Sequence, residues 1–169
     1  NSASPTATDY NFRDIQFTPR FGTSNQTHVN SVPKIETEYS VSVKVTEGSP
    51  ITRTITNTDV DGVRVTIVVP SMTNYDNDEG DVNGSEFGLK IEIIENTGTV
   101  HIPITDTVVG KITSPYNRDY EINFPTQLNF PVSVRVTRTT EDSGNDKVTN
   151  AFSWFSYTEL IDEKRTYLN

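Results

Sequence analysis

The chain has 169 residues, of which 33% are hydrophobic, and carries a formal net charge of −9. This length allows one domain, or one domain and part of another, and an acidic surface repels phosphate backbones, so we expect no nucleic acid among its partners. The sequence has no cysteine, which excludes disulfides and thiolate chemistry. No run approaches the roughly 18 apolar residues of a membrane span.

Alternating apolar residues predict short β-strands along most of the chain, separated by turns. The first predicted strand covers residues 12–18, where Ile15 and Phe17 share one face. The other predicted strands cover residues 39–45, 51–56, 63–69, 87–93, 100–104, 120–124 and 132–136. The stretch from Asn74 to Ser85 is predicted to be a long acidic loop. Because no helical period appears, the sequence predicts an all-β fold, an antiparallel sandwich.

The acidic loop contains a candidate calcium site. Its candidate ligands are Asp76, Asp78 and Asp81, because hard cations bind several oxygen ligands on a flexible loop. The D-x-D start resembles a calcium loop, but Gly80 stands at the fifth position, where an EF-hand has an acidic residue or Asn. We therefore favour a solvated loop, and we predict no metal and no other cofactor.

No sequence pattern indicates catalysis. His28 and His101 are the only histidines, and neither lies in a recognisable nucleophile motif. Carboxylates that act in pairs meet only in space, and nothing in the sequence singles out such a pair. We therefore predict that the chain is not an enzyme.

Four arginines are candidates for a basic stripe across neighbouring strands. In so acidic a chain, we expect them to pair across strands with Asp and Glu instead. These residues are Arg53, Arg64, Arg135 and Arg138.

The densest aromatic segment lies near the end of the chain. It contains Phe152, Trp154, Phe155 and Tyr157. In a regular strand the first two share one face and the last two share the other. Because both faces carry large aromatic side chains, we expect this strand to be covered on both faces, either within this chain or within a longer parent protein. A sugar-stacking platform is the alternative. We interpret the four residues as an exposed assembly surface, and full burial of Trp154 and Tyr157 would contradict this interpretation.

Three segments carry a resemblance to a known family. They are SPITRTIT (residues 49–56), VSVRVTRTTEDS (132–143) and FSWFSYTELIDEKRTYLN (152–169). In this order and spacing they resemble the N-terminal region of the tip attachment protein J family of lambda-like siphophages, also called host specificity protein J. The last block is the most specific, although Phe155 stands where the family usually has a small Ser.

The resemblance implies a fold and a place for the chain. Such proteins form a trimeric hub at the tip of a long tail and carry inserted fibronectin type III-like domains. The expected fold is thus an antiparallel fibronectin type III or immunoglobulin-like sandwich with extra flanking strands. The expected domains are residues 1–46 (N-terminal flanking strands of the hub), 47–140 (the sandwich) and 141–169 (a strand segment that returns to the hub).

The resemblance also implies a function and partners. The chain would be a non-catalytic structural part of a phage or prophage tail tip, made in the bacterial cytoplasm and located at the virion tail tip. Its partners would be other tail-tip and tail-tube proteins, two further copies in a homotrimer, and a host surface receptor. The alternative that the residues leave open is a carbohydrate- or receptor-binding sandwich module of a bacterial surface adhesin.

Overall fold

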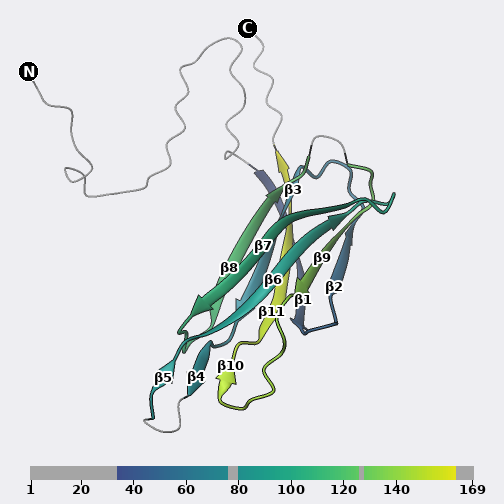
Figure 1. Cartoon of the computed structure of the whole chain (residues 1–169). Coiled ribbons are helices and arrows are strands. Elements are labelled where there is room, and N and C mark those ends of the chain that lie inside the picture. Colours follow the sequence, from purple (N-terminus) through teal and green to yellow (C-terminus); the bar gives the residue numbers. More distant parts are fainter. Residues whose placement is uncertain (1–33, 76–79, 126–127, 163–169) are drawn as a thin grey trace, which may run out of the picture. The chain divides into compact units, whose positions relative to one another are not determined.

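The computed structural model describes residues 34–75, 80–125 and 128–162 (Figure 1). The strand predicted over residues 12–18 lies outside these ranges. Within them the chain forms strands and no helix, so the described part contains no helix that could cross a membrane. The strands are β1 (Lys34–Val45), β2 (Ile51–Ile55), β3 (Gly62–Val69), β4 (Thr73–Tyr75), β5 (Val82–Asn83), β6 (Ser85–Ile94), β7 (Val100–Gly110), β8 (Tyr116–Asn123), β9 (Val132–Arg138), β10 (Val148–Thr149) and β11 (Phe152–Asp162).

Three antiparallel sheets make up this part of the chain. The first sheet has the order β1-β11-β3-β8, and the second sheet has the order β2-β9-β6-β7. The small sheet, β10-β4-β5, lies at one end of the sandwich (Figure 1). It contains parts of the predicted acidic loop, because β4 and β5 flank residues 76–79. The predicted all-β antiparallel sandwich is confirmed.

The core lies between the first and second sheets, and alternation explains it. In β3, for example, Val63, Val65 and Ile67 are fully buried and alternate with Arg64 and Thr66. Side chains of both sheets meet in one cluster, and each large side chain buried there contributes roughly 1.5–3 kcal/mol. The largest fully buried side chains are Trp154, Phe87 and Phe152.

The sandwich extends further along the chain than the sequence predicted. β11 lies between β1 and β3 and pairs with both strands. The predicted boundaries at 47 and 140 are therefore too narrow, since β1 and β11 are integral strands of the first sheet. Alternation shows where strands lie in the sequence but not which distant strands pair with each other. It therefore could not show that β11 pairs with β1 and β3.

The chain enters and leaves the sandwich at one end, and the small sheet lies at the other. Lys34 pairs with Asp162 in the β1–β11 register, so the chain enters and leaves the sandwich side by side. We call this the proximal end. The twelve residues of β1 span about 35 Å and lead to the opposite, distal end, where Val45 pairs with Phe152. The small sheet also lies at the distal end (Figure 1).

Two glutamates with little exposure fix the second sheet. The Glu92 carboxylate accepts hydrogen bonds from Arg135 Nε at 2.7 Å and Lys90 Nζ at 3.1 Å, and the bond from Arg135 lowers its pKa. Glu95 hydrogen-bonds His101 Nε2 at 2.7 Å and accepts a bond from Asn129 N at 3.0 Å. The hydrogen bond with His101, followed by those from Asn129, lowers the pKa of Glu95.

Acidification is therefore expected to destabilise the sandwich. A carboxyl group whose pKa is lower in the folded state stabilises the fold above its unfolded pKa, near 4.5, and this contribution is lost as the pH falls through the folded value. Burial raises the pKa of Glu159, so this group contributes to the pH dependence of stability with the opposite sign. The pH dependence of the whole domain therefore does not isolate the contribution of Glu92 or Glu95.

The Glu92→Gln variant isolates the effect of one glutamate. We expect this variant to unfold at lower urea concentration than the parent at neutral pH, and its stability to decrease less between about pH 5 and about pH 3. Urea unfolding at several pH values measures both quantities. Equal pH slopes for the two proteins would contradict the prediction.

Candidate functional site

Three of the four predicted assembly aromatics lie in the core of the sandwich. Phe152 and Trp154 are fully buried, and Tyr157 is 8% exposed. The Phe152 ring stacks on Phe87 at 4.5 Å between centroids, across the two sheets. The predicted assembly surface is therefore wrong for these three residues, because β11 is a central strand whose inner face is covered by the second sheet.

A β-bulge explains why Phe155 differs from its neighbours. The β11–β3 register runs from Trp154–Ile67 to Ser156–Thr66, so Phe155 has no partner on β3. Trp154 Nε1 donates a hydrogen bond to Ser156 O at 2.8 Å across the bulge. The extra residue shifts the alternation, so Trp154 and Tyr157 both pack in the core while Phe155 stays 44% exposed. Phe155 is thus the one predicted assembly residue that the fold leaves at the surface.

Two of the three candidate calcium ligands lie outside the described residues. Asp76 and Asp78 belong to the 76–79 stretch, and Asp81 is exposed. Across the ranges that the structure describes, no three His, Cys, Asp or Glu side chains come together as metal ligands would. The solvated loop without a bound metal therefore stays a prediction.

His101 is part of a structural cluster. Its ring bonds Glu95, which also accepts hydrogen bonds from the main chain and side chain of Asn129. This cluster joins the β6–β7 turn to the connection between β8 and β9. No described hydroxyl group hydrogen-bonds the His101 ring, so the pair lacks the nucleophile of a triad. His28 lies outside the described residues.

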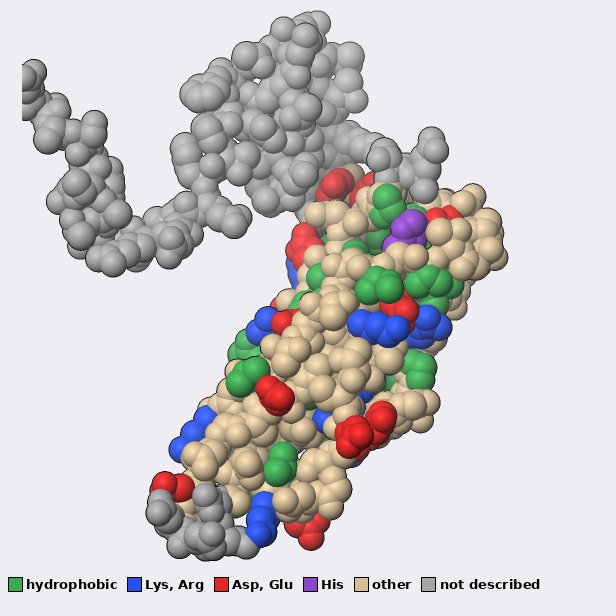
Figure 2. Space-filling view, in the orientation of Figure 1, with side chains coloured by type: hydrophobic (Ala, Val, Ile, Leu, Met, Phe, Trp, Pro, Cys, Tyr) green, Lys and Arg blue, Asp and Glu red, His purple; other side chains and the backbone are tan. Residues whose placement is uncertain are grey.

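The arginines mostly pair with acids, as predicted. Arg135 binds Glu92, and Arg64 binds Glu36 through both terminal nitrogens at 2.8 and 2.9 Å. Arg53 instead donates to the neighbouring Thr52 carbonyl. Figure 2 shows one face of the molecule, on which basic and acidic side chains lie next to one another. This face has no continuous basic stripe of the kind that binds nucleic acid.

Arg138 differs from the other three arginines because its side chain is fully buried. Its guanidinium donates to the carbonyls of Thr140, Glu141 and Asn150 at 2.9–3.3 Å. It also lies 3.4 Å from the Asp142 carboxylate and over the Phe152 ring. Desolvation lowers the pKa of Arg138. This side chain therefore holds the connection between β9 and β11 against the distal end of the core.

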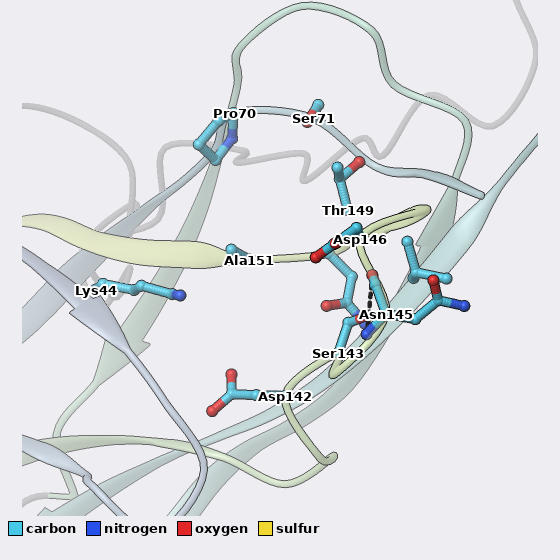
Figure 3. A pocket seen from close by; sticks show the side chains of 11 residues that line it. Lys44, Pro70, Ser71, Asp142, Ser143, Asn145, Asp146, Thr149 and Ala151 are labelled. Carbon is cyan, nitrogen blue, oxygen red and sulfur yellow. Dashed lines mark hydrogen bonds between the residues drawn. The ribbon is translucent and has the colours of Figure 1, made fainter. Parts of the chain in front are cut away.

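The connection held by Arg138 forms one wall of a cleft of about 310 Å³ at the distal end. The other walls are Lys44 near the end of β1, and Pro70 and Ser71 after β3 (Figure 3). No sequence pattern indicated this cleft, because its walls come from three segments far apart in the chain. Polar residues between Glu141 and Lys147 supply part of the lining, and a short polar stretch does not by itself indicate a cleft.

Comparison with known proteins places this sandwich in a family. Residues 35–163 match the family described as tip attachment protein J, FNIII-A domain, which is more than half of the chain. The chain belongs to this family. The match begins at the second residue of β1 and ends just after β11, so the FNIII-A domain corresponds to the whole sandwich described above. The predicted family resemblance is confirmed.

Two curated relatives of the FNIII-A chain carry the same name. The tip attachment protein J of Escherichia phage SECphi4 is 35% identical over 90% of this chain, and that of Escherichia phage SECphi27 is 28% identical over 93% of it. The chain spans 13% of the length of each relative. Among solved structures, a chain of the infectious bursal disease virus Gt strain matches 85% of this chain and 38% of its own, with a TM-score of 0.40 and 17% identity, too low to support an argument.

Proposed function

We propose that this FNIII-A domain is a non-catalytic part of a phage or prophage tail-tip protein and that it helps the tip attach to a host cell. The observation that carries the proposal is the family match over the whole sandwich, together with the name of both relatives, tip attachment protein J. The internal pairing of His101 with Glu95, whose carboxylate also accepts a hydrogen bond from Asn129 N, supports a structural role rather than a catalytic one.

The paired ends of the sandwich support an inserted domain. Because β1 begins where β11 ends, the rest of a longer chain needs to open at only one point to admit the whole sandwich. The proximal end would then face the hub, and the distal end would project from it. The hub would be a homotrimer that contacts other tail-tip and tail-tube proteins, and the site of action would be the virion tail tip.

Electron microscopy of intact tails tests this location. A small tag inserted at Gly48, in the exposed turn between β1 and β2, marks the distal end without interrupting a strand. We expect the label at the tail tip, in three copies around the axis. Label elsewhere on the particle, or particles that lack the protein, would contradict the proposal.

Phe155 is the residue that we expect to contact a tail-tip partner. An exposed aromatic ring on the outer side of a sheet is a typical anchor of a protein interface. We expect Phe155→Ser in the full-length protein to reduce its incorporation into tails several-fold, with little change in the stability of the domain. Quantitative immunoblotting of purified tails measures the incorporation.

A matched control is available on the second sheet. Val109 lies on the edge strand β7 and is 69% exposed, so Val109→Ser removes a comparable exposed apolar group elsewhere. We expect this variant to be incorporated normally. Equal incorporation of the parent protein and both variants would show that Phe155 is not an assembly contact.

A further inference from the structure

The distal cleft has the size and position of a small-ligand site. Its volume of about 310 Å³ lies at the lower end of the range for ligand pockets, roughly 300–1,000 Å³. It opens at the end of the sandwich farthest from Lys34 and Asp162, about 35 Å along β1. A domain attached at its proximal end would therefore present this cleft outward.

Hydrogen bonds hold the walls of the cleft in place. Asp142 Oδ2 accepts a bond from Glu47 N at 2.8 Å, which joins the β1–β2 turn to the connection after β9. Thr149 Oγ1 accepts a bond from Thr73 N at 3.0 Å, which joins β10 to β4. Together with the carbonyls held by Arg138, these contacts form the cleft before any ligand arrives, which lowers the entropic cost of binding.

Two charged side chains in the lining have no internal partner. Lys44 extends into the cleft toward the connection that carries Asp142 and Asp146 (Figure 3). Neither the Lys44 ammonium nor the Asp146 carboxylate forms a hydrogen bond or ion pair with any residue in the described ranges. One cationic donor and one anionic acceptor therefore remain for a ligand.

The chemistry of the lining selects a ligand class. Lys44 donates hydrogen bonds to hydroxyl oxygens, and Asp146 accepts them from hydroxyl groups, so a polyhydroxylated molecule satisfies both. Pro70 and Ala151 supply apolar surface for the carbon face of such a molecule. The Arg138 guanidinium lies 3.4 Å from Asp142 and balances its charge, and Lys44 balances Asp146, so the cleft has no excess positive charge to attract phosphates or acidic sugars.

We propose that the distal cleft binds a neutral saccharide of one or two rings. This proposal rests on the proposed function, because it makes the cleft the part of the domain that touches the glycans of the host surface. A single sugar ring that makes a few hydrogen bonds in an open cleft binds weakly, with a dissociation constant on the order of millimolar. Three copies in one tail tip would act together and raise the effective affinity.

Saturation-transfer NMR on the 169-residue chain tests the binding directly. The probes are galactose, glucose and maltose as neutral sugars, with glucuronate and glucose 6-phosphate as anionic ones. We expect saturable transfer to at least one neutral sugar and at least about tenfold weaker transfer to the anionic probes. No transfer to any neutral probe, or equal transfer to the anionic ones, would overturn the proposal.

Variants show whether the cleft is the site. Asp146→Asn and Lys44→Met each remove one charge-assisted hydrogen bond, and each should weaken binding about tenfold. Ser71→Trp fills the cleft and should abolish binding. The matched controls are Asp59→Asn and Lys111→Met, which change exposed groups outside the lining and should leave binding unchanged. Melting temperatures confirm that each variant folds. Binding that survives all three cleft variants would overturn the proposal.

The two proposals fail in different ways. If a neutral sugar binds the isolated chain but the tagged protein is absent from the tail tip, the proposed function fails and the sugar site stands. If the protein is at the tip and the cleft variants adsorb to cells as fast as the parent, with no sugar binding to the chain, the sugar site fails and the tail-tip function stands.

Discussion

Replacing Trp154 by alanine is expected to cost the fold about 3–5 kcal/mol of unfolding free energy. The indole is fully buried between the sheets, packs 6.1 Å from the Tyr157 ring and donates a hydrogen bond to Ser156 O. Domains of this size have total stabilities of about 5–15 kcal/mol, so the variant would be close to unfolding. Guanidinium titration followed by far-UV circular dichroism measures the loss, because Trp154 is the only tryptophan in the sequence and its fluorescence disappears with it.

The neighbouring residue provides the control for Trp154. Phe155→Ala removes an aromatic ring from the same strand, one position away, but from the surface. We expect it to change stability by no more than about 0.5 kcal/mol. Similar losses in the two variants would show that the β-bulge does not separate a core position from a surface position.

Arg138→Met is expected to be the second most damaging change, at roughly 3–5 kcal/mol. Methionine replaces only the aliphatic stem of arginine and has no donors, so the carbonyls of Thr140, Glu141 and Asn150 would lose their partners. Thr140 and Asn150 are half-buried and Glu141 is exposed, so each of these acceptors that water cannot reach costs about 1–3 kcal/mol when it loses its hydrogen bond. Urea unfolding measures the loss, and hydrogen exchange should show faster exchange of amides between β9 and β11.

Two further variants show which property of Arg138 stabilises the domain. Arg138→Lys keeps the charge but cannot bind three carbonyls with one planar group, so we expect an intermediate loss. Arg53→Met is the matched control, since this guanidinium bonds only the adjacent Thr52 carbonyl within the described structure. A loss at Arg53 as large as that at Arg138 would mean that the contacts of the Arg138 guanidinium with the three carbonyls are not what stabilises the distal end.

Local patterns predicted the elements well. Alternation located β3, β6 and β9 to within two residues at each end. These features depend on a few neighbouring residues. The resemblance to the J family also pointed to the right family, because the block after Phe152 is distinctive.

Long-range pairing could not be read from the sequence. The insertion of β11 between β1 and β3 depends on contacts over about a hundred residues, so β11 was assigned to a separate segment. The bulge at Phe155 breaks the alternation that would have shown which aromatics point inward. The distal cleft needs three distant segments to meet. One signal was present and missed: Arg138 follows Val132, Val134 and Val136 on the same face of β9, which places it inward.

The pairing of Lys34 with Asp162 also has a mechanical consequence. A force that pulls these two residues apart acts across the β1–β11 pair rather than along it, so it loads the hydrogen bonds one after another from the proximal end. The β1 and β11 strands would therefore separate at low force, starting at the proximal end. Tension carried through the parent protein would pass between the two neighbouring attachment points, and the distal end would bear little of it.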